Sequence, residues 1–214
     1  MVLSGASSFK TNRERVSALF IDLRIAIFGG TFDPVHQAHL AVARTARDLF
    51  FLDKVLVVPA AHPPHKLNQY RESYEHRFQM VELACRGERG LEASRLEAGL
   101  ERSYSIHTIE RIRDSLSPAD RLFFLIGADA FAEVTTWHRW QDVLEQVEFI
   151  VVSRPGHSYA VPSGAVVHRL DSVEIPISSS EIRRDLHSGG PVLELPPRIL
   201  RYIRQHNLYS GLSE

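Results

Sequence analysis

Residues 24–40 read RIAIFGGTFDPVHQAHL, and this segment indicates the fold class. Its first five residues form a short, mostly apolar run closed by Gly29 and Gly30, which predicts a buried strand ending in a tight turn. An amphipathic helix pattern follows, with its apolar face on Leu40, Ala43, Ala46, Leu49 and Phe50. A strand, a glycine turn and a helix in this order are typical of the opening unit of a parallel sheet.

The same alternation continues along the chain. We expect strands at 54–58, 91–96, 121–126, 148–152 and 166–170, and helices at 72–85, 105–116, 137–146, 179–187 and 197–206. Strands made of near-continuous apolar runs indicate an α/β fold, a Rossmann-like parallel sheet with helices on both faces. Ligands of such sheets bind beyond the carboxyl ends of the strands. The residues that follow Phe28, Val58, Ile126 and Val152 are therefore the first candidates for a site.

Composition narrows the function classes. The chain has 214 residues, 44% of them hydrophobic and 24% charged, so we expect one domain over 23–214 behind a flexible extension, 1–22. A net charge of -1 disfavours a nucleic-acid partner. The single cysteine, Cys85, excludes an internal disulfide framework and a cysteine-based zinc site, which fits a reducing cytoplasm. No apolar run is long enough to span a membrane, so no membrane partner is expected.

The segment after the first strand has the features of a phosphate site. Pro34 fixes the entry to a helix whose first N–H groups lack intrahelical acceptors, and such an N-terminus favours an anion. His36 and His39 are three residues apart, so both face one side of the first turn and can donate hydrogen bonds to phosphoryl oxygens. Two histidines at this spacing are also found on ordinary helix surfaces. A zinc pair would need a third ligand, which the sequence does not offer.

A second segment, ISSSEIRRDL at 177–186, allows two interpretations. Ser178 and Glu181 match a capping box, so the serine run is explained as the start of a helix. Arg183, one turn further, would face the same anion as the free N–H groups if the segment binds phosphate. The segment alone does not decide between these interpretations.

Both segments resemble one family. G-G-T-F-D-P-x-H-x-x-H resembles the phosphate-binding motif of bacterial nicotinate-nucleotide adenylyltransferases, in the HxGH nucleotidyltransferase superfamily, although Ala38 stands where that family usually has Gly. I-S-S-S-x-I-R resembles the superfamily's second motif, which holds the β- and γ-phosphates of ATP. The resemblance implies a fold of the nucleotidyltransferase type. It also implies that ATP is bound by Gly29, Gly30, Thr31, Phe32, His36, His39, Asp129, Ser179, Ser180 and Arg183.

Three further segments resemble the nicotinate-nucleotide branch. T-W-H-R-W at 136–140 implies that Trp137 stacks on the pyridine ring, although two tryptophans this close are more often core residues. The loop at 62–66, HPPHK, implies that Lys66 meets phosphate, where a solvated surface lysine is the alternative. The segment at 103–108, SYSIHT, implies substrate contacts from Tyr104 and Ser105, and its His107 replaces an acid that is common in the family.

The resemblance implies transfer of the adenylyl group of ATP to nicotinate mononucleotide, giving nicotinate adenine dinucleotide and pyrophosphate in NAD biosynthesis. His36, His39, Lys66 and Arg183 are the expected catalytic residues, and Mg²⁺ is expected to arrive with ATP rather than in a protein metal site. The alternatives are an adenylyltransferase for nicotinamide mononucleotide or phosphopantetheine and a non-catalytic nucleotide sensor. A dinucleotide-binding oxidoreductase is disfavoured, because G-x-G-x-x-G is missing after the first strand.

Overall fold

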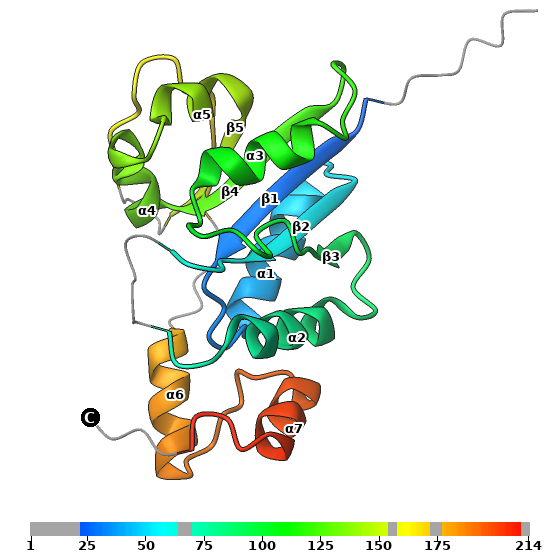
Figure 1. Ribbon diagram of the computed structural model, residues 1–214, viewed down its shortest axis with the longest axis vertical. Coiled ribbons are helices and arrows are strands. Elements are labelled where there is room, and N and C mark those ends of the chain that lie inside the picture. The colour runs from blue at the N-terminus through cyan, green and yellow to red at the C-terminus, as the bar shows by residue number, and fades with distance from the viewer. Residues whose placement is uncertain (1–21, 64–69, 154–157, 172–176, 211–214) are drawn as a thin grey trace, which may run out of the picture.

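The computed structural model describes residues 22–63, 70–153, 158–171 and 177–210. Six strands form one sheet in the order β3-β2-β1-β4-β5-β6, and every neighbouring pair is parallel (Figure 1). The strands are β1 (Arg24–Gly30), β2 (Lys54–Pro59), β3 (Leu91–Ala93), β4 (Arg121–Gly127), β5 (Glu148–Val152) and β6 (Val167–Leu170). The predicted parallel α/β sheet is confirmed.

Helices cover both faces of this sheet. They are α1 (Gln37–Leu49), α2 (Tyr74–Cys85), α3 (Ser105–Arg113), α4 (Ala128–Ala132), the 3₁₀ turn η2 (Val134–Thr136), α5 (Trp140–Gln146), α6 (Ser179–Ser188) and α7 (Pro197–Gln205). Ala26 and Phe28 of β1 belong to a core that also contains buried residues of α1, α2, α6 and α7. Ile25 and Ile27 belong to a second core, shared with α3, α4 and α5. Successive side chains of β1 thus point to opposite faces, as a strand buried on both sides requires.

The strand order changes direction at β1. From β1 the chain builds β2 and β3 on one side, and then crosses back to place β4 on the other side. Phe28 lies opposite Val57 of β2 and Leu125 of β4, so the carboxyl ends of the three strands lie together. A change of direction of this kind is where open α/β sheets bind ligands. Figure 1 shows α6 and α7 together at one end of the molecule, below α2.

Several predicted element boundaries were wrong. The helix expected at 137–146 begins only at Trp140, because Arg139 has φ 54°, a left-handed conformation that an α-helix does not contain. Trp137 therefore lies in the turn between η2 and α5. The helix expected from residue 72 begins at Tyr74, where Ser73 caps it by accepting a hydrogen bond from the His76 N–H. The strand expected at 91–96 ends at Ala93, and α4 was not predicted.

Two further expectations concern the N-terminal extension and membrane-spanning helices. The predicted extension at 1–22 lies outside the described residues except for residue 22, so the domain boundary stays a prediction. Among the helices of the described ranges, none is both long enough and apolar enough to cross a membrane.

Candidate active site

The turn after β1 is shaped by a folded-back aromatic ring. A Cβ atom added to Gly30 would lie 2.9 Å from the Phe32 ring, so a side chain at this position would displace that ring. The Phe32 side chain is only 2% exposed, and its ring packs 4.9 Å from the His39 ring, centre to centre. Phe32 thus packs against His39, and its contact with ATP stays a prediction. Gly29 is the last but one residue of β1, and Thr31 is the first residue after the strand.

His36 and His39 face each other at the start of α1. Their ring centres are 3.8 Å apart, and the His36 backbone N–H donates a hydrogen bond to His39 Nδ1 over 3.2 Å. An imidazole nitrogen that accepts carries no proton, so the proton of a neutral His39 is on Nε2. His39 therefore presents one N–H donor on the far side of its ring.

Both imidazoles are neutral at pH 7. Burial lowers the pKa of His36 from 6.5 to about 4, in keeping with a residue that is only 3% exposed. Burial, and then repulsion from His36, hold the pKa of His39 well below its ordinary value. His36 Nδ1 is buried and has no hydrogen-bond partner among the described residues. Such an unpaired atom is expected at a site that a ligand or water completes.

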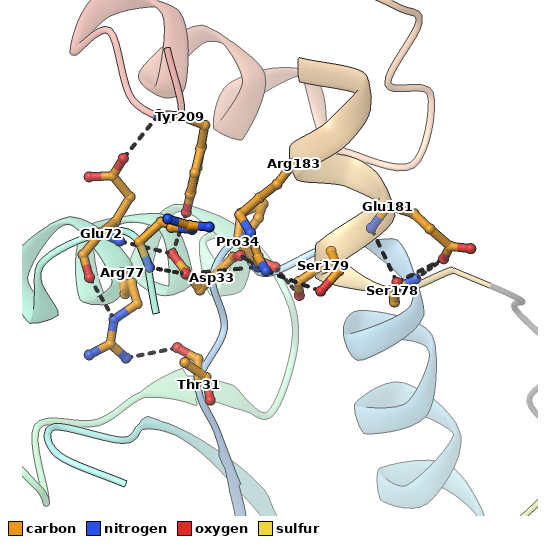
Figure 2. A network of polar contacts seen from close by, with 12 residues as sticks. Thr31, Asp33, Pro34, Glu72, Arg77, Ser178, Ser179, Glu181, Arg183 and Tyr209 are labelled. Atoms are coloured by element: carbon orange, nitrogen blue, oxygen red, sulfur yellow. Dashed lines mark hydrogen bonds and ion pairs between the residues drawn. The ribbon is translucent and has the colours of Figure 1, made fainter. Parts of the chain in front are cut away.

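The start of α6 docks onto the turn before α1. Ser178 caps α6, because its hydroxyl accepts from the Glu181 N–H while the Glu181 carboxylate accepts from the Ser178 N–H, and the predicted capping box is confirmed. The Ser179 hydroxyl donates to the Pro34 carbonyl over 3.0 Å. Figure 2 shows this contact beside Arg183, which lies one turn further along α6.

Arg183 joins the two sequence motifs. Its Nη1 donates to the Asp33 carbonyl over 2.6 Å, and its Nη2 donates to the Ser180 hydroxyl over 3.0 Å. The guanidinium is thus fixed between the loop before α1 and the first turn of α6, although the segments lie 150 positions apart in sequence. The serine run can therefore start a helix and also serve an anion site. The same residues begin α6 and hold Arg183 beside the loop that precedes α1.

A set of buried polar residues behind this loop was not predicted. The Asp33 carboxylate, 2% exposed, accepts hydrogen bonds from the Arg71 N–H, the Glu72 N–H and the Tyr209 hydroxyl. Asp33 stands inside the first motif, but nothing in the sequence indicated that residues near 71 and 209 would meet there.

Arg77 is the second member of this set that the sequence did not reveal. It is fully buried, and it donates to the backbone carbonyls of Thr31, Ala60 and Glu72. Burial lowers the pKa of Arg77, yet a guanidinium keeps its charge in proteins. The buried guanidinium therefore connects the turn after β1 to the loop after β2 by hydrogen bonds to both. A charged residue in a helix is normally exposed, so no sequence signal pointed to this role.

The predicted nicotinate residues lie on the other face of the sheet. Trp137 is half-buried, and its ring contacts the ring of Phe124. The Phe124 ring also lies beside Gly29, because a Cβ atom added to Gly29 would be 3.8 Å from Phe124 Cζ. Phe124 belongs to the core under α3, whereas Phe28, beside His39, belongs to the core under α1. The two predicted groups thus flank the carboxyl edge of β1 from opposite faces.

Tyr104 and Ser105 lie where α3 begins. The Tyr104 ring lies 4.5 Å from the His138 ring, and its backbone N–H already donates to the Arg102 carbonyl. Ser105 is the first residue of α3, and the first N–H groups of a helix have no intrahelical acceptor. The Ser105 amide is therefore the better candidate donor of the two.

The remaining predicted residues are Asp129 and Lys66. Asp129 is exposed in the first turn of α4, directly after β4 and so at the same edge of the sheet. Lys66 lies outside the described residues, and its role stays a prediction. In the part of the chain that the structure describes, no group of three or more His, Cys, Asp or Glu side chains is arranged to hold a metal ion.

Comparison with known proteins identifies relatives of the whole fold. The model of the cytidylyltransferase-like family matches residues 27–185. A protein of Solibacter usitatus named "Probable nicotinate-nucleotide adenylyltransferase" is 58% identical over 188 residues, which are 88% of this chain and 100% of that protein. A Thermus thermophilus protein with the same name is 40% identical over 190 residues, 87% of this chain and 100% of that protein.

A solved structure supports the fold. Nicotinic acid mononucleotide adenylyltransferase of Plasmodium falciparum, complexed with NaAD, superposes with a TM-score of 0.72 at 20% identity. The superposition covers 87% of this chain and 97% of the other.

Proposed function

This chain belongs to the cytidylyltransferase-like family and, within it, to the nicotinate-nucleotide adenylyltransferases, and from that premise we propose how its own residues act on ATP and nicotinate mononucleotide. The reaction joins the adenylyl group of ATP to nicotinate mononucleotide in NAD biosynthesis and releases pyrophosphate. The 5′-phosphate of the mononucleotide attacks the α-phosphorus in line, so no protein nucleophile is required. The protein's task is to position two phosphates and to stabilise charge.

The observation that carries this proposal is the hydrogen bond from the His36 N–H to His39 Nδ1. It leaves the Nε2–H of His39 free to donate to an oxygen of the α-phosphoryl group, where negative charge grows in the transition state. Because both imidazoles are neutral, they orient the phosphoryl group without neutralising it. Charge neutralisation must then come from a cation, and Arg183 is held beside the same loop.

The start of α6 is proposed to hold the leaving pyrophosphate. Its free N–H groups favour an anion, and Arg183 adds a full positive charge. Ser180 accepts from Arg183, so the proton of its hydroxyl is free to reach a phosphate oxygen. Ser179 already donates its proton to the Pro34 carbonyl, so its contact with phosphate requires that bond to break. Ser180 is therefore the stronger of the two predicted ligands.

Mg²⁺ is proposed to enter with ATP. The described residues offer no protein cluster for a metal ion, so its ligands would be mainly phosphate oxygens and water, an arrangement that Mg²⁺ commonly adopts. When bound, it would lower the repulsion between the two phosphate groups. Exposed Asp129 is the carboxylate proposed to meet either the adenosine ribose or a metal-bound phosphate.

On the opposite face, Trp137 is proposed to stack on the nicotinate ring while the Ser105 amide meets its carboxylate. Stacking on an indole face suits a positively charged pyridinium. Lys66 and Tyr104 complete the proposed substrate contacts.

A pyrophosphate-release assay with ATP and Mg²⁺ tests the function. Nicotinate mononucleotide, nicotinamide mononucleotide and phosphopantetheine are offered separately as acceptors. We expect nicotinate mononucleotide to give the highest kcat/KM. A preference for phosphopantetheine would contradict the proposal, and ATP binding without turnover on any acceptor would indicate a nucleotide sensor.

A further inference from the structure

Both oxygens of the Asp33 carboxylate accept hydrogen bonds, although the carboxylate lies next to a cation. One oxygen, Oδ1, accepts from the Tyr209 hydroxyl over 2.8 Å and from the Glu72 N–H over 3.3 Å. The other, Oδ2, accepts from the Arg71 N–H over 2.7 Å and lies 3.8 Å from Arg183 Nη1. A separation of 3.8 Å is beyond a hydrogen bond, so the two charged groups attract each other without direct bonding.

Tyr209 is held firmly in place to make its bond. Its backbone N–H donates to the Glu72 carboxylate over 3.0 Å, and its hydroxyl donates to Asp33 (Figure 2). Its φ of 60° lies in the left-handed region, which L-residues other than Asn and Asp rarely adopt, so packing and these bonds must compensate for the strain. The side chain is 4% exposed. Burial and the nearby Asp33 carboxylate raise the pKa of the Tyr209 hydroxyl, which therefore stays protonated and donates.

The guanidinium of Arg183 is oriented by neutral groups and not by a direct bond to the Asp33 carboxylate. It bonds the Asp33 backbone carbonyl and the Ser180 hydroxyl, which orient the guanidinium without neutralising its charge. In the described part of the chain it is the one cation within ion-pair distance of the Asp33 carboxylate. A buried carboxylate that loses a donor is costly to leave unsatisfied, and a direct arginine–carboxylate pair is the strongest substitute.

We propose that the Tyr209 hydroxyl is a positioning group for ATP binding, because it occupies the Asp33 carboxylate and so leaves the charge of Arg183 available to the phosphates of the nucleotide. The inference rests on the proposed role of Arg183. Without the hydroxyl, Asp33 turns toward Arg183, shortens the 3.8 Å gap and competes with phosphate for the guanidinium. A residue near the C-terminus thereby affects how strongly Arg183 attracts the phosphates of ATP.

Tyr209→Phe tests the proposal, because it removes the hydroxyl and keeps the ring. We expect the KM for ATP to rise roughly three- to tenfold, the range that corresponds to the loss of one hydrogen bond, while the KM for nicotinate mononucleotide stays unchanged. Tyr202→Phe is the matched control. The Tyr202 hydroxyl also makes one side-chain hydrogen bond, to His76 over 2.9 Å, but it lies between α2 and α7 and away from Asp33. This control is expected to leave both KM values unchanged.

A double-mutant cycle with Arg183→Ala separates positioning from stability. Once Arg183 is absent, Tyr209→Phe is expected to have no further effect on the KM for ATP. If Arg183→Ala itself leaves that KM unchanged, the proposed role of Arg183 is wrong and the inference is lost with it. If Arg183→Ala raises the KM but Tyr209→Phe does not, or if the two effects add, the role of Arg183 stands and the inference is overturned. A lower Tm for Tyr209→Phe with an unchanged KM also overturns it.

Discussion

Acidification is expected to weaken the fold through His36. Its pKa is 6.5 in an unfolded chain and about 4 in the folded protein, because the side chain is buried. Between these values the unfolded state binds a proton that the folded state does not, so folding stability falls as pH falls. The contribution is fully present above about pH 6.5 and is lost as the pH approaches about 4. Each pKa unit corresponds to about 1.36 kcal/mol, so the total is about 3 kcal/mol, and about 2 kcal/mol is lost by about pH 5.

Urea unfolding at a series of pH values measures this loss. The free energy of unfolding of the wild-type protein is compared with that of His36→Gln, which cannot titrate in this range. His39 is present in both proteins, but its pKa is lowered partly by repulsion from His36, so the difference between their slopes reports His36 together with its effect on His39. We expect the variant to lose about 2 kcal/mol less between about pH 7.5 and about pH 5. The matched change at His187, which is exposed on α6, controls for the loss of a histidine in itself. Parallel pH dependences of wild type and His36→Gln would refute the burial argument.

The remaining predictions concern substrate binding and the N-terminal segment. Arg183→Ala should raise the KM for ATP roughly tenfold or more. Arg183→Lys should lower that KM only slightly from the Arg183→Ala value, because an ammonium cannot reproduce the planar guanidinium held between Asp33 and Ser180. A wild-type KM for Arg183→Lys in steady-state kinetics would contradict this geometry. At saturating ATP, kcat/KM should be at least about tenfold higher for nicotinate mononucleotide than for its amide analogue. The reason is that an amide N–H₂ facing the Ser105 N–H leaves a donor unpaired. Equal kcat/KM values would indicate dual specificity. Removing residues 1–21 should leave turnover unchanged and shift the Tm by no more than about 2 °C; a larger drop in a melting experiment would mean that the segment packs on the core.

The fold followed from short-range patterns. The strand-like run at 24–28 and its glycine turn predicted β1 and the edge at which the site lies, because a buried strand has a clear signature in one sequence. Boundaries that depend on a single backbone conformation were missed. The left-handed Arg139 delays α5 and leaves Trp137 in a turn, and no pattern in the sequence distinguishes that residue from a helical one.

The candidate site was predictable only in part. His36, His39 and Arg183 carry motifs, and the structure brings them to one loop. Asp33 also lies inside a motif, but the partners of its carboxylate could not be predicted, and Arg77 and Tyr209 carry no motif at all. Their roles come from contacts between segments up to 176 positions apart. A residue such as Arg77 is recognised as buried only when the three carbonyls that it binds are assembled around it.

The turnover of His39→Ala tests most directly whether His39 stabilises the transition state. The free Nε2–H of His39 is proposed to donate to the transition state, and losing one such donor typically lowers kcat by about 100- to 1,000-fold. Turnover is measured at saturating ATP and nicotinate mononucleotide, with the Tm recorded for the same preparation. We expect a Tm close to that of the wild type and a loss of kcat in this range. A folded His39→Ala protein with a kcat near the wild-type value would contradict this role.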